Sequence, residues 1–248
     1  CREFEKEFAQ FAGTQYAVAL ANGTVALDVA LKPLQIGAGD DVIVTSRTFL
    51  ASASSIVTAG ANPIFADVEL DSQNISRRTI EAVLTPNTKA IICVHLAGWM
   101  CDMEPIMQLA AEKGLYVIED CAQAHGAKYK GKPAGSIGHI AAWSFCQDKI
   151  MTTGGEGGMV TTNDEQLWKK MWSYKDHGKS YDSVYNKQHP PGFRWLHDSF
   201  GTNWRMMEMQ AVIGRIQLKK MTEWTEIRNH NMQRIYSAFE KTPYITVF

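Results

Sequence analysis

The sequence lacks long hydrophobic runs and any concentration of charge of one sign. No apolar stretch approaches the ~20 residues of a membrane-spanning helix, and no signal-peptide pattern opens the chain. Its 25 lysine and arginine residues nearly balance 26 acidic residues, so the formal net charge is only -1. Nucleic-acid binding needs a concentrated basic face, which this balance does not supply. We therefore expect partners other than nucleic acid or membrane.

Cysteine is also scarce, with five residues and no CxxC pair. Cys93, Cys121 and Cys146 lie in or beside strand-like runs, where small buried thiols are common. This usage favours a reducing compartment, and we expect a cytoplasmic protein. The chain opens at Cys1 without an initiator methionine and stops at Phe248 within a strand-like run, so we interpret it as a fragment.

Short apolar runs alternate along the chain with stretches of helical periodicity. This alternation predicts an α/β fold with a mostly parallel central sheet flanked by helices. Strands are predicted at residues 16–21, 41–45, 63–66, 90–95, 115–118, 141–145 and 159–162. Helices are predicted at residues 2–12, 24–34, 49–59, 76–84, 102–113, 205–221 and 223–240.

The pattern lapses between residues 174 and 203, which we interpret as a long functional loop. We place a large domain over residues 1–222 and the beginning of a small C-terminal domain over residues 223–248. Ligands of parallel sheets bind beyond the carboxyl ends of the strands, so the segments that follow the predicted strands are the candidates for a site.

An acid and a lysine follow two of these strands. Asp120 comes after the apolar run 115–118, and Lys149 comes shortly after the run 140–143. A carboxylate can hold the ring nitrogen of pyridoxal 5′-phosphate (PLP), and an amine can form a Schiff base with its aldehyde. Plainer interpretations remain open, because Asp120 could cap a turn or bind a metal and Lys149 could be solvated.

Three other segments could complete a cofactor site. Asn22-Gly23-Thr24 joins a strand to a helix, where free N–H groups favour a phosphate, although an ordinary helix cap has the same sequence. Phe49 could stack on a flat ring or belong to the core. Gln123 could donate to a ring hydroxyl or be a polar turn residue. We interpret His95 and His125 as hydrogen-bonded structural histidines.

Together these residues resemble the DegT/DnrJ/EryC1/StrS family of PLP-dependent nucleotide-sugar aminotransferases. The matching stretches, in the family's order, are Ala21-Asn22-Gly23-Thr24-Val25-Ala26-Leu27, Glu119-Asp120-Cys121-Ala122-Gln123-Ala124-His125-Gly126, Ser144-Phe145 with Lys149, and Gly201-Thr202-Asn203-Trp204-Arg205-Met206. The resemblance implies an aspartate-aminotransferase-like fold (PLP-dependent transferase type I) and a homodimer with shared active sites. The implied reaction moves an amino group, most often from glutamate, to a keto carbon of a nucleotide-linked deoxysugar.

The resemblance also implies a role for each residue, and no metal. Lys149 would form the Schiff base and move the proton, and Asp120 would pair with the pyridinium nitrogen. The other implied contacts are Gln123 near the ring's 3′ oxygen, Gly23, Thr24 and Ser144 at the phosphate, Phe49 stacked on the ring, and Asn203 at the phosphate of the partner subunit's cofactor.

Three alternatives share this scaffold. In sugar dehydratases of the family a histidine replaces the Schiff-base lysine, so Lys149 favours transamination. The sequence does not exclude an aminotransferase that makes aminated cyclitols or aromatic precursors. A non-catalytic regulatory protein would not need Lys149, Asp120 and Gln123 together. Glu156 lies one residue further from Lys149 than in many relatives, which predicts a rearranged loop. The motifs specify neither the nucleotide, the sugar nor the carbon aminated.

Overall fold

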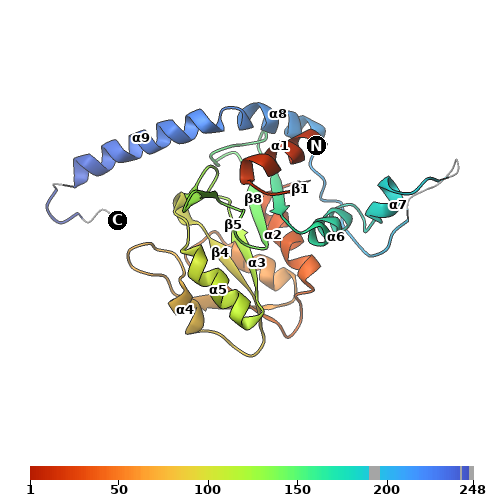
Figure 1. Cartoon of the computed structure of the whole chain (residues 1–248), viewed down its shortest axis with the longest axis horizontal. Coiled ribbons are helices and arrows are strands. Elements are labelled where there is room, and N and C mark those ends of the chain that lie inside the picture. The colour runs from red at the N-terminus through yellow and green to blue at the C-terminus, as the bar shows by residue number, and fades with distance from the viewer. Residues whose placement is uncertain (190–195, 241, 246–248) are drawn as a thin grey trace.

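A central sheet organises the molecule (Figure 1). The structure, a computed structural model, describes residues 1–189, 196–240 and 242–245. Within these ranges seven strands pair in the order β1-β9-β8-β5-β4-β2-β3. Their bounds are β1 Tyr16–Leu20, β2 Asp41–Thr45, β3 Asn62–Ala66, β4 Thr88–Val94, β5 Tyr116–Asp120, β8 Ile140–Ser144 and β9 Gly158–Thr162. A separate hairpin pairs β6 Lys128–Tyr129 with β7 Lys132–Pro133.

In the seven-stranded sheet the pairing is parallel except at β9, which runs antiparallel to both β1 and β8. The apolar runs explain this arrangement, because a parallel strand is covered on both faces and therefore carries few polar residues. In β8 every residue is buried, and Ala141 and Ala142 face opposite sides of the sheet. The predicted fold, a mostly parallel sheet flanked by helices, is confirmed.

Helices cover both faces of the sheet. One face packs against α2 Gly23–Leu31, α3 Ala51–Thr58 and α6 Glu165–Lys175. The other packs against α1 Arg2–Ala12, α4 Arg77–Glu81, α5 Met103–Lys113 and α8 Glu208–Leu218. Short 3-10 turns lie at Lys32–Leu34 and Leu96–Gly98.

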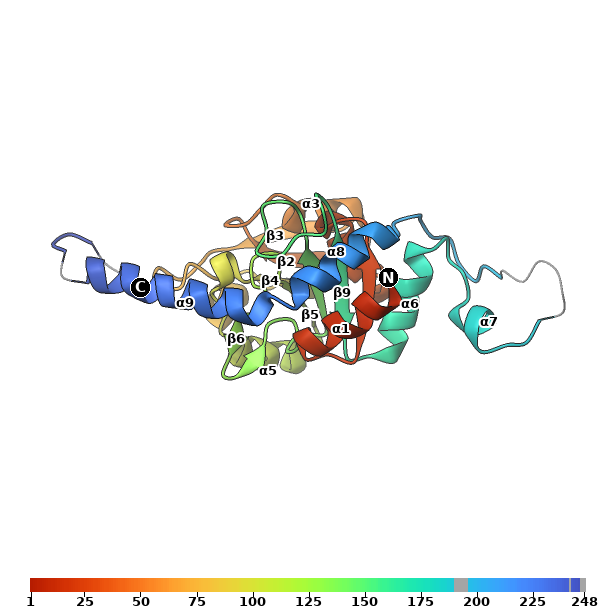
Figure 2. The ribbon, with the colours of Figure 1, turned by 90° about the horizontal axis from the view of Figure 1, so that it is seen from above.

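Helices α1 and α8 lie side by side although they are far apart in the sequence (Figure 2). Arg215 donates to both carboxylate oxygens of Glu7, at 2.9 and 2.7 Å. Gly214 allows the close approach, since a Cβ atom there would lie 2.6 Å from the ring of Phe4.

Two segments project at opposite ends of the molecule, α7 Tyr181–Tyr185 and α9 Met221–Phe239 (Figures 1 and 2). The prediction of one long loop at residues 174–203 was wrong in part, because this stretch contains the end of α6 and all of α7. Residues 190–195 of that loop lie outside the described residues. Helix α6 was not predicted, although Asp164 caps it by accepting from the N–H groups of Gln166 and Leu167.

The carboxyl ends of β1, β2, β4, β5 and β8 all reach the same edge of the sheet. Strand β1 shares their direction because it is antiparallel to β9, as β8 is. The segments that follow these strands therefore meet at this edge, as the sequence predicted. The domain boundary at residue 222 stays a prediction, and it falls at the start of α9, where Met221 is buried.

Candidate active site

A cavity of about 390 Å³ lies at this edge of the sheet. Its walls contain seven of the eight residues that the sequence predicted for the site: Gly23, Thr24, Phe49, Asp120, Gln123, Ser144 and Lys149. They come from the ends of β1, β5 and β8 and from the segment that leads into α3. The eighth residue, Asn203, lies outside this cavity.

Asp120 is the last residue of β5 and is 6% exposed. Its Oδ1 accepts from the backbone N–H of Ala122 at 3.1 Å, and its Oδ2 accepts from Ser52 Oγ at 2.7 Å. Burial raises the pKa of Asp120, and these two hydrogen bonds and the charge of Lys149 oppose that rise. A buried carboxyl of this kind is stabilised in its charged form by any further donor or cation placed in the cavity.

Ser52 is a site residue that the sequence did not reveal. Its side chain lies in the first turn of α3, is fully buried, and contacts both Asp120 and the hydroxyl of Thr48, the latter at 2.8 Å. Both hydroxyl-bearing residues line the cavity. The only local signal was their position close to Phe49, with Thr48 one residue before it and Ser52 three residues after it.

Lys149 follows β8 after a short turn, in which its N–H donates to the carbonyl of Cys146 at 3.0 Å. The side chain is 23% exposed, and its Nζ lies 3.6 Å from Oδ1 of the exposed Asp148. The charge of Lys149 also acts on Asp120 and His125. The lysine is therefore in the cavity with the carboxyl and is not a fully solvated side chain.

The N-terminus of α2 forms another wall of the cavity. Asn22 caps the helix by accepting from the N–H of Val25 at 3.0 Å. The first N–H groups of a helix have no partner inside it, so those of Gly23 and Thr24 suit an anion. Gly23 is required for the approach to β8, since a Cβ atom there would lie 2.5 Å from that of Ser144. The turn thus combines helix N–H groups with a serine hydroxyl.

Gln123 has a fixed orientation. Its Oε1 accepts from the backbone N–H of Ala97 at 2.8 Å, so its Nε2 remains as the donor. Ala97 holds this position with φ 53°, a left-handed conformation that is uncommon for a residue with a Cβ atom. Gln123 therefore has a directed N–H donor, which is compatible with the first of the two roles that the sequence left open.

Phe49 is not a core residue, because 71% of it is exposed. It precedes α3 and lines the cavity. An exposed aromatic ring beside a polar cavity offers a flat apolar surface to a ligand. Glu156 also lines the cavity, and its carboxylate accepts from the thiol of Cys146 at 3.8 Å.

Asn203 is held next to Asp176, with which it forms an antiparallel bridge. Its Oδ1 accepts from Arg205 Nε at 2.9 Å, and Arg205 also lies 3.3 Å from Asp176. The side-chain amide nitrogen of Asn203 is thus the group available for another partner.

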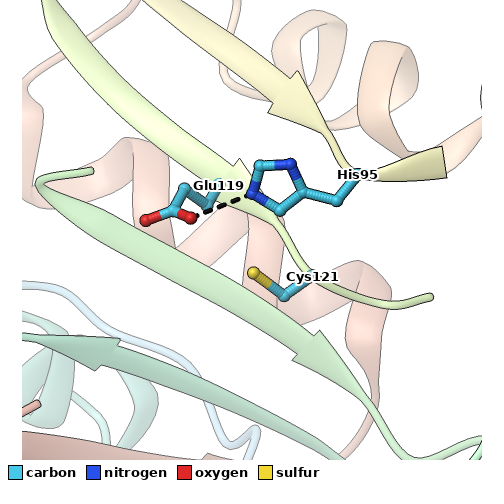
Figure 3. A group of neighbouring side chains, drawn as sticks. All are labelled: His95, Glu119 and Cys121. Atoms are coloured by element: carbon cyan, nitrogen blue, oxygen red, sulfur yellow. Dashed lines mark hydrogen bonds and ion pairs between the residues drawn. The ribbon is translucent and has the colours of Figure 1, made fainter. Parts of the chain in front are cut away.

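His95 and Glu119 form a buried pair (Figure 3). Because side chains alternate along β5, Glu119 lies on the face of the sheet opposite Asp120. His95 Nδ1 accepts from the N–H of Cys101 at 3.2 Å, so Nε2 carries the proton and donates to Glu119 at 2.9 Å. Backbone N–H groups of residues 135, 137 and 138 donate to the same carboxylate, at 3.0, 2.9 and 2.6 Å.

Glu119, His95 and Cys121 offer ligand atoms within 4.8 Å of one another. Burial raises the pKa of Cys121 to about 12, so it stays a thiol, whereas metals bind the thiolate. Because hydrogen bonds already use both ring nitrogens of His95 and the carboxylate of Glu119, we interpret the group as a structural cluster. The expectation that His95 is a hydrogen-bonded structural histidine is confirmed.

His125 departs from that expectation. Its ring is buried against Trp143 and Phe145, but neither nitrogen has a hydrogen-bond partner among the described residues. Burial, helped by the charge of Lys149, lowers the pKa of His125 to about 3, which keeps the ring neutral.

The cavity fits PLP by the chemistry of its donor set. An anion site at α2 and Ser144 suits the phosphate, and Lys149 offers an amine. Asp120 offers a carboxylate whose burial favours a cationic partner, and Phe49 offers a flat surface. These groups lie in one cavity and differ in the part of the cofactor that each can bind.

Comparison with known proteins gives consistent results. The model of the DegT/DnrJ/EryC1/StrS aminotransferase family matches residues 1–248. A curated relative, GDP-perosamine synthase of Caulobacter vibrioides, is 45% identical over 96% of this chain and 60% of its own length.

Solved structures agree. An aminotransferase from Psychrobacter cryohalolentis superimposes with a TM-score of 0.96 at 68% identity, covering 97% of this chain and 61% of that one. DesV of S. venezuelae, solved in complex with ketimine intermediate, gives 0.88 at 35% identity over 98% and 62% of the two chains. The chain thus spans about three fifths of the length of these relatives.

Proposed function

Because the chain belongs to the DegT/DnrJ/EryC1/StrS aminotransferase family, we propose that it is the PLP-binding part of a nucleotide-sugar aminotransferase. The proposed reaction transfers an amino group, with glutamate as the expected donor, to a keto carbon of a nucleotide-linked deoxysugar. The observation that carries the proposal is the single cavity that holds Lys149, Asp120 and the N-terminus of α2.

The residues divide the work between binding and proton transfer. When bound, PLP supplies an electron sink for the carbon that loses or gains the proton. Lys149 would hold the cofactor through its amine and carry the proton between that carbon and C4′ as general base and acid. Asp120 would hold the proton on the ring nitrogen. Gly23, Thr24 and Ser144 would bind the phosphate, Gln123 would donate to the 3′ oxygen, and Phe49 would cover the ring.

We propose a nucleotide-linked sugar as acceptor because the matched relatives carry such names. A GDP-linked keto sugar is the first compound to test, since GDP-perosamine synthases are among them. The regulatory and dehydratase alternatives have less support, because Lys149 is present in the cavity together with Asp120.

We also propose a homodimer in the cytoplasm. An apolar stripe on α8, formed by Met209, Val212 and Ile216, is 69, 54 and 55% exposed in the described chain, which suits a covered interface. Asn203 would then reach the phosphate of the partner subunit's cofactor through its amide nitrogen. None of the described helices has the length and apolar character needed to cross a membrane.

The test follows the amino group. The protein, PLP, isotope-labelled glutamate and a set of GDP-, UDP- and dTDP-linked keto sugars are incubated, and the products are analysed by mass spectrometry. Label in an amino sugar, absent with Lys149→Ala, is the expected result. Label in none of the products, from a protein that retains PLP, would contradict sugar amination.

A further inference from the structure

Two hydroxyl groups lie behind Asp120, on the segment that also carries Phe49. Ser52 Oγ lies 2.7 Å from Asp120 Oδ2 and 2.8 Å from Thr48 Oγ1. Ser52 is fully buried and Asp120 nearly so. This contact joins α3 to β5, and neither the sequence motifs nor the proposed function gives Ser52 or Thr48 a role.

The number of protons on each group determines which hydroxyl is the donor in each of these hydrogen bonds. A serine hydroxyl has one proton to donate, and a carboxylate has none. Ser52 therefore donates to Asp120, and Thr48 must donate to Ser52. The result is a relay of two hydroxyls that ends on Oδ2, while the N–H of Ala122 restrains Oδ1. The carboxylate is held at both oxygens, and each oxygen keeps a lone pair for a ligand.

We propose that Ser52, oriented by Thr48, is a positioning residue that aims the Asp120 carboxylate at the ring nitrogen of PLP and keeps it charged. The inference rests on the proposed function, because it concerns the cofactor assigned to this cavity. Ser52 touches Asp120 and acts through it.

The electrostatics of the site support this role. Burial disfavours the charged form of Asp120, and the hydrogen bond from Ser52 is the largest of the influences that lower its pKa again. Without that hydroxyl the carboxyl would hold its own proton more readily. A neutral carboxylic acid would no longer attract the proton of the ring nitrogen, so the cofactor would lose its charged partner.

The arrangement also couples two contacts with the ring. Thr48, Phe49 and Ser52 lie within five consecutive positions, at the start of α3. A shift of this segment would move the exposed ring of Phe49 and the relay together. One short segment, residues 48–52, thus carries both the stacking surface and the hydroxyls that contact the partner of the ring nitrogen.

The experiment compares binding of PLP with binding of its deaza analogue, in which a C–H group replaces the ring nitrogen. Dissociation constants are measured by absorbance titration of the apoprotein for the wild type, Ser52→Ala and Ser55→Ala. Ser55 is a matched control, since it is a buried serine on the same helix and donates to the backbone oxygen of Ser52 at 3.3 Å.

Ser52→Ala should weaken PLP binding about tenfold, as expected for one hydrogen bond to a charged group, and change binding of the deaza analogue by less than about twofold. Ser55→Ala should change both constants by less than about twofold. Equal losses for the two compounds, or no loss for PLP, would overturn the role of Ser52.

Thr48→Val provides a second variant if Ser52→Ala does not fold, and it should weaken PLP binding about threefold while sparing the analogue. An equal effect on both compounds would count against the relay. Binding by the wild-type protein distinguishes a failure of the proposed function from a failure of this inference. Binding of neither compound would refute the proposed function and this inference with it, whereas normal wild-type binding with unselective variants would refute the inference alone.

Discussion

Glu119 and Asp120 are consecutive residues of one strand, both buried, yet they face two different environments. Glu119 points to the side of α1 and α5 and accepts from His95 and three backbone N–H groups. Asp120 points to the side of α3, into a cavity, and accepts from Ser52 and Ala122. The Glu119 carboxylate thus accepts four hydrogen bonds from the protein, whereas the Asp120 carboxylate accepts two and can accept others from a ligand.

The difference appears in the pKa values. Burial alone would raise the pKa of Glu119, but the hydrogen bonds from His95 and the loop N–H groups outweigh it and lower the pKa below its usual value. Burial dominates at Asp120 and raises its pKa. Burial by itself therefore does not identify a functional acid. The informative feature is a buried acid whose partners in the chain do not offset its desolvation.

The largest expected effect on activity comes from Lys149, which lines the same cavity as Asp120. Lys149→Ala should lower turnover about 10⁴-fold, the upper end of the contribution of general acid–base catalysis. Stability should change little and PLP should still bind without covalent attachment. Lys169→Ala is the control, because Lys169 has a similarly exposed side chain, at 22% against 23% for Lys149, outside the cavity. Wild-type turnover of Lys149→Ala, measured with saturating PLP, would refute the assigned mechanism.

Glu119 should be the more important of the two acids for stability. Glu119→Ala leaves His95 and three backbone N–H groups without their acceptor and should cost about 3–5 kcal/mol of unfolding free energy. Asp120→Ala should cost less than about 1 kcal/mol, because its loss also relieves desolvation. Urea unfolding of the apoproteins measures both values. Equal losses of unfolding free energy in the two variants would contradict the difference between the environments of Glu119 and Asp120.

The pH dependence of stability should have opposite signs at the two acids. Glu119, with a lowered folded pKa, stabilises the fold above about pH 4.3 and loses this contribution as the pH falls through the folded value. Asp120, with a raised folded pKa, costs stability as the pH rises above about 3.9. Relative to wild type, Glu119→Gln should thus become more destabilising with rising pH and Asp120→Asn more stabilising. Unfolding at pH values from about 2.5 to about 7 tests this, because the Glu119 contribution changes below about pH 4.3 and the Asp120 contribution above about pH 3.9. Parallel trends for the two variants would contradict it.

Asn203 extends the comparison to a residue outside the cavity and should give the smallest effect. Asn203→Ala should weaken PLP binding about threefold to tenfold in the dimer by removing one hydrogen bond to a charged phosphate. Thr202→Ala is the neighbouring control. Unchanged affinity in a protein shown to be dimeric by sedimentation would remove Asn203 from the site.

Much of the site could be predicted because it follows strand ends. Asp120 ends one buried strand and Lys149 follows another after a short turn, and parallel strands bring such positions to one edge. The alternation of side chains along a strand also predicts that Glu119 and Asp120 face opposite sides. It does not predict which side carries the cavity, since that depends on the packing of α3 against the sheet.

The missed residues depend on contacts between distant segments. Ser52 lies 68 positions from Asp120, and nothing in its own segment distinguishes it from Ser54 or Ser55. Ala97 contributes a backbone N–H, which no side-chain pattern reveals. The omission of α6 has another cause, because the capping acid Asp164 was a readable local signal.

The central claim is that this cavity holds PLP through Lys149. The direct test adds PLP to the apoprotein, reduces the product with borohydride and maps the modified peptide by mass spectrometry. The account predicts a visible absorption band and one adduct, on Lys149, which disappears in Lys149→Ala. No band, or an adduct on another lysine, would contradict it.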